Sequence, residues 1–145
     1  MATYISKNFA LEEFEASDTA KARHISNAAT PDAIIALTYL CINVLQPLRD
    51  WFGCEIKIGS GYRSKALNRA VGGVSNSQHM EGKAVDLCID GDMAKGRRWF
   101  EYIRDHLPFD QLIWEHNAKG TYWVHVSFNW NGRNRRQVIN NLLKS

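Results

Sequence analysis

The longest regular pattern of apolar positions lies between Thr30 and Gly53. Thr30, Pro31 and Asp32 are typical of a helix start: a capping hydroxyl, a first-turn proline and an early acid. Apolar residues then recur at steps of three and four, which predicts a helix with one buried face. We expect Pro47 to kink this helix or Gly53 to end it. The apolar positions are Ile34, Leu37, Leu40, Cys41, Val44, Leu45 and Leu48.

The rest of the chain shows shorter patterns of both periods. Helices are predicted at 11–23, 64–71, 93–107 and 137–143. Strands are predicted at 55–58, 83–89, 111–115 and 122–128, the last two joined as a hairpin. Helices come first and strands later, without regular alternation. We therefore predict an α+β fold, a small mainly antiparallel sheet with helices packed on one side, as a single domain over residues 1–145.

Composition supports a single domain and limits the other possibilities. The 145 residues are 45% hydrophobic and 23% charged, the proportions of one soluble globular unit. Residues 1–9 are polar, and no later apolar run approaches about 18 residues, so we expect neither a secretion signal nor a membrane anchor. The scattered Cys41, Cys54 and Cys88 predict reduced, mostly buried thiols. The net charge of +3 favours anionic surroundings without choosing among them.

Strand parity brings three chemical groups together. In 83–89 the apolar residues occupy the odd positions, so Asp86 points away from the core. In 122–128 they occupy the even positions, which directs His125 away from the core as well. If these strands share a sheet, Asp86 and His125 project from one surface, and the glycine-bounded loop bearing His79 can fold over it. Three nitrogen or oxygen ligands with one open position are what a catalytic zinc requires.

A spaced motif runs through the same residues: Ser77-x-His79-x-x-Gly82-x-Ala84-x-Asp86, followed by Trp123-x-His125. It resembles the zinc D-Ala-D-Ala carboxypeptidase and L-alanyl-D-glutamate endopeptidase family, to which several phage endolysins belong. A second segment, Ser60-Gly61-Tyr62-Arg63-Ser64 with Leu67-Asn68, is similar to the arginine-bearing segment of that family. The resemblance therefore extends over most of the chain.

The resemblance implies zinc-dependent hydrolysis of a peptide bond in bacterial peptidoglycan, of either the carboxypeptidase or the endopeptidase type. One zinc ion would be held by His79, Asp86 and His125. Arg63 would bind a substrate carboxylate or the oxyanion of the tetrahedral intermediate. Ser77 is expected to contact substrate too. Zinc lowers the pKa of bound water to about 7 and polarises the peptide carbonyl.

The general base is the point where the sequence departs from the family. Many members carry a glutamate three residues before the last histidine ligand, but Tyr122 stands there. Parity in 111–115 places Glu115 on the ligand face. If Ile113 pairs with His125, Glu115 lies opposite Trp123 and diagonal to the ligand, about 7–8 Å away between backbone positions. We therefore predict Glu115 as the base and give Trp123 a role in the substrate cleft.

Other residues and functions are kept as alternatives. Asp110 is the second candidate base, and Glu81 is a minor one. The missing glutamate also allows a zinc-stabilised wall-binding or structural module without turnover. Nucleic-acid binding ranks last. It would rest on Arg133, Arg135 and Arg136, a short basic run of the kind that usually forms a solvated face.

The remaining expectations concern location and assembly. His24, His106 and His116 are expected to be surface or structural residues. We expect a monomer that binds peptidoglycan and neither nucleic acid nor membrane. We also expect synthesis in the cytoplasm, after which another factor gives the enzyme access to the cell wall.

Overall fold

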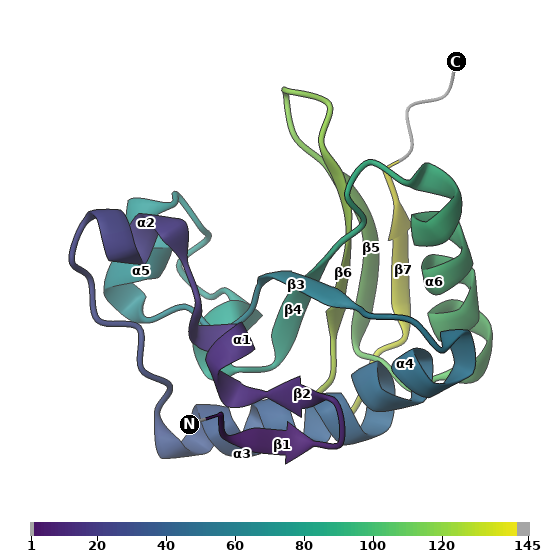
Figure 1. Ribbon diagram of the computed structural model, residues 1–145, viewed down its shortest axis with the longest axis horizontal. Helices are drawn as coiled ribbons and strands as arrows, with labels where there is room; N and C mark the ends of the chain where they lie inside the picture. Colours follow the sequence, from purple (N-terminus) through teal and green to yellow (C-terminus); the bar gives the residue numbers. More distant parts are fainter. Residues whose placement is uncertain (1, 142–145) are drawn as a thin grey trace.

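A five-stranded sheet lies at the centre of the protein (Figure 1). The computed structural model describes residues 2–141. The strands are β3 (Lys57–Ser60), β4 (Ala84–Cys88), β5 (Gln111–His116), β6 (Tyr122–Ser127) and β7 (Gln137–Asn140). Their order is β3-β4-β6-β5-β7, and the pairs are antiparallel except for β5 with β7. The predicted α+β class with a mainly antiparallel sheet is confirmed.

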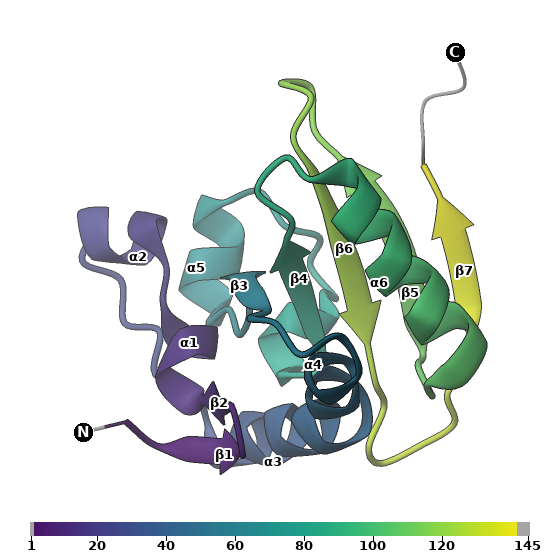
Figure 2. The ribbon, with the colours of Figure 1, turned by 45° about the vertical axis from the view of Figure 1, so that its right-hand side comes forward.

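Helices surround this sheet. They are α1 (Leu11–Glu15), α2 (Asp18–Ala22), α3 (Pro31–Leu40), α4 (Gln46–Phe52), α5 (Lys65–Ala70) and α6 (Met93–His106). Figure 2 shows α6 lying across β6 and β5. The contacting helices α2 and α5 lie together beyond β3, away from α6 (Figure 1). A 3₁₀ turn, η2 (Gln78–Glu81), contacts both α3 and β4.

The predicted helix from Thr30 to Gly53 is present along its whole length. The Thr30 hydroxyl accepts a hydrogen bond from the Ala33 amide, and the helix ends at Gly53. A π-helical turn, η1 (Cys41–Leu45), joins α3 to α4 just before Pro47. A wider turn at this point accommodates the proline ring, which would otherwise clash with the preceding turn.

The same helix bears on the expectation that no segment is suited to span a membrane. At 22 residues, it is long and apolar enough to do so by length and composition. The expectation counted uninterrupted apolar residues, whereas here polar residues are interspersed. Within the protein, 50% of its most apolar window is buried, as is usual for the central helix of a core.

The hydrophobic core follows the predicted strand parity. Val85, Leu87 and Ile89 are completely buried on one side of β4 and its end, as are Val124 and Val126 on β6. Side chains at the intervening positions therefore emerge on the opposite face of the sheet. That face carries the candidate site.

Three predictions about local structure were wrong. The helix at 11–23 is divided into α1 and α2, because Ala16 is extended and Ser17 caps a new helix through the Ala20 amide. The segment at 137–140 forms β7, since pairing with the open edge of β5 satisfies its backbone, and residues 142–143 lie outside the described chain. The third strand occupies 57–60 in place of 55–58.

Two further features differ from the expectations. Strands β1 (Tyr4–Ser6) and β2 (Phe9–Ala10) form a small sheet that was not predicted, since each is too short to show alternation. The three cysteines are free, as expected, but only Cys41 is buried, while Cys88 is half-buried and Cys54 is exposed.

The π turn provides a test of the core assignment. Leu45 is completely buried, whereas Ile42 in the same turn is 55% exposed. We expect Leu45→Ala to lower the free energy of unfolding in urea by about 2–5 kcal/mol, and Ile42→Ala by less than about 1 kcal/mol. Equal losses in the two variants would contradict this placement of the helix.

Candidate metal centre

Asp86 and His125 lie directly opposite each other on neighbouring strands. They are paired in the register of β4 with β6, and both point to the face away from the core, as strand parity predicted. Nδ1 of His125 lies 2.9 Å from Oδ1 of Asp86 and donates a hydrogen bond to it. Neighbouring strands thus hold a carboxylate and an imidazole side by side.

The turn η2 brings His79 to this pair. Ser77 caps the turn by accepting a hydrogen bond from the His79 amide. Gly82 ends the turn with φ of 73°, and a Cβ there would lie 2.5 Å from the Ala33 carbonyl oxygen. Only glycine lets the turn pack this closely on α3. As a result His79 is fixed against the sheet with 4% exposure.

A backbone carbonyl sets the orientation of the His79 ring. Nδ1 of His79 lies 2.7 Å from the carbonyl oxygen of Gly61, which can only accept, so Nδ1 carries the proton. Nε2 of the neutral ring then presents its lone pair to Oδ2 of Asp86, 3.5 Å away. Two acceptors that face each other at this distance require a cation beside them, either a proton or a metal ion.

The cluster of His79, Asp86 and His125 fits a divalent metal. One ligand atom from each residue lies within 4.8 Å of the others. Ligands bound tetrahedrally at about 2.0–2.1 Å are roughly 3.4 Å apart, close to the 3.5 Å between His79 and Asp86. The hydrogen bond from Nδ1 of His79 to the Gly61 carbonyl is also typical of metal-binding histidines, whose other ring nitrogen binds the ion. Two imidazoles and one carboxylate are a donor set that zinc accepts.

The electrostatics of Asp86 are consistent with cation binding. Burial disfavours its charged form, but when the His125 and His79 rings carry the shared proton, their hydrogen bonds and positive charge outweigh burial and hold the pKa of the Asp86 carboxyl well below the usual range. Asp86 is therefore ionised at neutral pH, when it can act as a metal ligand.

Arg63 forms the edge of the cluster next to β3. Nη1 donates to Oδ1 of the buried Asn68 at 3.0 Å, and Nε donates to Ser60 at 3.3 Å. Nη2 lies 3.9 Å from Oδ2 of Asp86. Burial lowers the pKa of Arg63, and Asp86 offsets part of that shift. The guanidinium is thus held in place with donor capacity remaining. Asn68 was part of the motif, but the sequence did not indicate this supporting role.

The comparisons with known proteins agree with this geometry. The family model described as Peptidase M15 matches residues 7–127, a range that includes the cluster and Arg63. The chain belongs to the peptidase M15 family. The resemblance drawn from the spaced motif is therefore confirmed. A search of curated proteins finds no match to the chain.

Cavities flank the M15 cluster on both sides of β4. One, of about 510 Å³, lies towards β3 and is lined in part by Ser60, Arg63 and Gly73. Another, of about 360 Å³, lies towards β6 and β5 and is lined by Val74, Asn76, Ser77, Gln78, Gln111, His125 and Arg135. A chain that crosses the cluster could therefore occupy space before and after it.

Asp110 has a structural role in this M15 fold. It is 3% exposed and accepts hydrogen bonds from the amide, Nε and Nη2 of Arg135 and from the side chain of Gln78. These bonds, chiefly those from Arg135, outweigh burial and hold the pKa of Asp110 at about 2. A carboxylate with this pKa and four donors is poorly suited to take another proton. Its position does not support the role of second candidate base.

The other candidate bases differ in position. Ile113 pairs with His125 and Glu115 with Trp123, the register on which the sequence-based assignment depended. The half-buried Glu115 accepts a hydrogen bond from Asn141 at 3.0 Å. Glu81 has a side chain that is 56% exposed and is paired with Lys83 at 3.9 Å.

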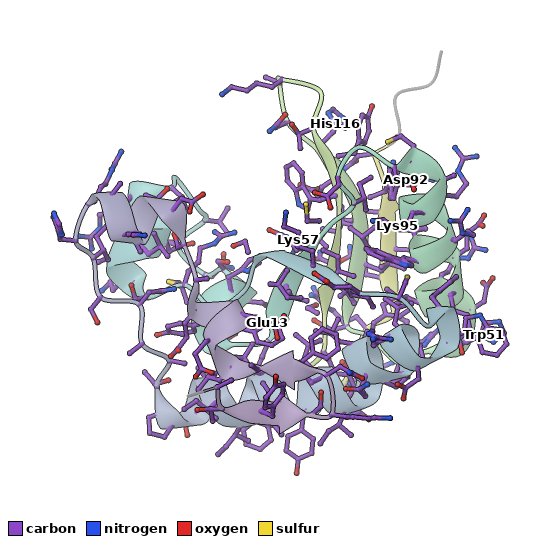
Figure 3. All side chains as sticks on the ribbon, in the orientation of Figure 1. Glu13, Trp51, Lys57, Asp92, Lys95 and His116 are labelled. Carbon is purple, nitrogen blue, oxygen red and sulfur yellow. The ribbon has the colours of Figure 1, made fainter. Side chains whose placement is uncertain are left out.

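Some of the remaining predicted residues lie at the cluster, and others lie away from it. Ser77 lines the cavity next to His125 as well as capping η2, and the half-buried Trp123 shares the ligand face. Arg135 and Arg136 are exposed but hydrogen-bonded to the protein itself, Arg135 to Asp110 and Arg136 to two backbone carbonyls. His116 lies at the hairpin end of β5 (Figure 3).

Removal of one ligand should abolish metal binding. We expect the wild-type protein, dialysed against zinc, to retain about one equivalent, and Asp86→Asn to bind at least roughly 100-fold more weakly. Asp105→Asn is the matched control, because Asp105 is exposed on α6 and paired with Arg104. Metal content by elemental analysis and affinity by calorimetry would measure the effect. Undiminished zinc in Asp86→Asn would contradict the assignment of the site.

The Asp110 network should show in the pH dependence of stability. Because its folded pKa of about 2 lies below the unfolded value, its contribution is present above pH 4 and is lost as pH falls towards 2. We expect the free energy of unfolding of the wild type to fall by about 1–2 kcal/mol more than that of Asp110→Asn between pH 5 and pH 2. Parallel curves for the two proteins would show that Asp110 has no such role.

Proposed function

We propose that this M15 family member hydrolyses a peptide bond in the stem peptides of bacterial peptidoglycan, using one zinc ion held by His79, Asp86 and His125. The observation that carries the proposal is the convergence of these three side chains, with acceptor atoms of His79 and Asp86 facing each other at 3.5 Å, in a chain whose family is that of metallopeptidases. The peptidoglycan substrate follows from the motif resemblance.

The residues around the cluster have separable roles. A bound zinc ion would supply an activated water and polarise the peptide carbonyl. The Gly61 carbonyl keeps the His79 ring in the tautomer that leaves Nε2 free for the metal. Arg63, held by Asn68 and Ser60, directs its remaining donors to a substrate carboxylate or to the oxyanion that develops during attack.

Glu115 is the proposed general base. Asp110 is occupied by four donors, and Glu81 is solvent-exposed in its pair with Lys83. Glu115 is half-buried on the ligand face, and its pair with Trp123 lies two residue pairs along the hairpin from the pair of Ile113 with His125. The separation requires one intervening water or a turn of the carboxylate away from Asn141.

The cavities on either side of β4 favour cleavage of an internal bond. A carboxypeptidase needs a closed end at which the terminal carboxylate is recognised, whereas an endopeptidase needs space on both sides of the cut bond. Cavities of about 510 Å³ and about 360 Å³ flank the cluster. We therefore propose the endopeptidase type.

Dye release from labelled peptidoglycan tests the activity and the base together. We expect release by the zinc-loaded wild type, and a rate lower by about 100-fold or more in Glu115→Gln with zinc content unchanged, because general bases contribute about 10²–10⁴-fold. Glu101→Gln, on the exposed side of α6, is the control.

Three outcomes would separate the alternatives. Full activity of Glu115→Gln would remove Glu115 as the base. Absence of release by the wild type from several kinds of wall would favour a zinc-stabilised binding module. Mass spectrometry of the digested fragments would identify the bond, and loss of a single terminal residue would contradict the endopeptidase type.

A further inference from the structure

The cavity beside Arg63 has a second wall that the sequence motif does not include. This wall is the junction of α1 with α2, where Ala16, Ser17, Asp18 and Thr19 line the space. Ser17 caps α2 by accepting a hydrogen bond from the Ala20 amide at 3.1 Å. The cap fixes the first turn of α2, so Asp18 is presented at the rim of the cavity from a defined backbone.

The two charged groups of this cavity lie on different walls. Arg63 enters from the metal side, where its side chain is 16% exposed and anchored by Asn68. Asp18 is exposed on the wall formed by the junction of α1 with α2. Among the described residues 2–141, no ion pair joins Asp18 to a basic side chain within 4.0 Å. The cavity thus offers a cation and an anion that do not neutralise each other.

Part of the lining of this cavity is apolar. Tyr62 and Leu67 are 6% and 2% exposed and line the cavity, as does Val71, which is 46% exposed. Methylene groups can lie on such a surface while a charged end remains in water. The arrangement matches a ligand with a carboxylate, an aliphatic stem and an ammonium group.

We propose that this cavity is a specificity subsite for a diamino-acid residue of the substrate peptide. Arg63 binds a carboxylate on a neighbouring part of the peptide, the methylenes of the diamino-acid residue lie against Leu67 and Val71, and Asp18 receives its side-chain ammonium. This inference rests on the proposed peptidase function and adds to it a residue that selects the substrate. Asp18 acts on binding and takes no part in bond cleavage.

The size of the effect follows from the exposure of Asp18. Ion pairs between exposed groups are weak, so we expect a preference of about two- to fivefold in kcat/KM. The preference should appear in KM with kcat nearly unchanged, because the pair forms equally in the ground state and the transition state. A purely structural role for Asp18 would not discriminate between two substrates that differ only in one charge.

The test compares two stem peptides that are identical except for the side-chain amine, which is free in one and acetylated in the other. Wild-type zinc enzyme should cleave the free amine with the lower KM. Asp18→Asn should lose this preference, and Asp18→Lys should reverse it. Asp32→Asn is the matched control, since Asp32 also lies in the first turn of a helix and does not line this cavity. It should keep the preference.

The outcomes distinguish this inference from the proposed function. Cleavage of both peptides with equal KM, or an unchanged preference in Asp18→Asn, would overturn the subsite and leave the peptidase function intact. If the wild type cleaves neither peptide, the peptidase function fails, and calorimetric binding of the same peptides decides on the subsite. Tighter binding of the free amine that depends on Asp18 would support it, and equal binding would overturn it.

Discussion

The facing lone pairs of His79 and Asp86 are the constraint on which the site depends. The Gly61 carbonyl accepts a hydrogen bond from Nδ1 of His79, which carries the only N–H proton of the neutral ring. Nε2 therefore faces Oδ2 of Asp86 as a second acceptor, 3.5 Å away. The arrangement is unfavourable unless a cation shares the space. His125 adds a third possible ligand from the neighbouring strand, and a metal ion would supply the positive charge that the pair of His79 and Asp86 requires.

The fold fixes the positions of His79 and Asp86 through residues that are not themselves metal ligands. Gly82 allows η2 to pack on α3, and Gly61 approaches the Phe14 backbone so closely that a Cβ would lie 2.6 Å from its oxygen. Asp110 ties Gln78 of the same turn to Arg135. These contacts fix the ligand side chains before the metal binds, which reduces the loss of conformational entropy on binding.

Strand periodicity predicted more of the site than of the fold's periphery. Alternation in β4 and β6 was sufficient to place Asp86 and His125 on one face, and the hairpin register placed Glu115. The segment 137–143 was predicted as a helix, but residues 137–140 form a strand. So short a segment shows too little periodicity to identify its structure, and pairing with the open edge of β5 decided the outcome. The bonds that saturate Asp110 join residues distant in sequence, and no local pattern reveals them.

X-ray absorption at the zinc edge of the loaded protein tests the central claim most directly. The account predicts a shell of nitrogen and oxygen atoms at about 2.0–2.1 Å, with outer scattering from two imidazole rings. Sulfur at about 2.3 Å would contradict it and would point to Cys88, which lies two residues beyond Asp86 on the same face of β4. A shell without imidazole scattering would contradict it equally.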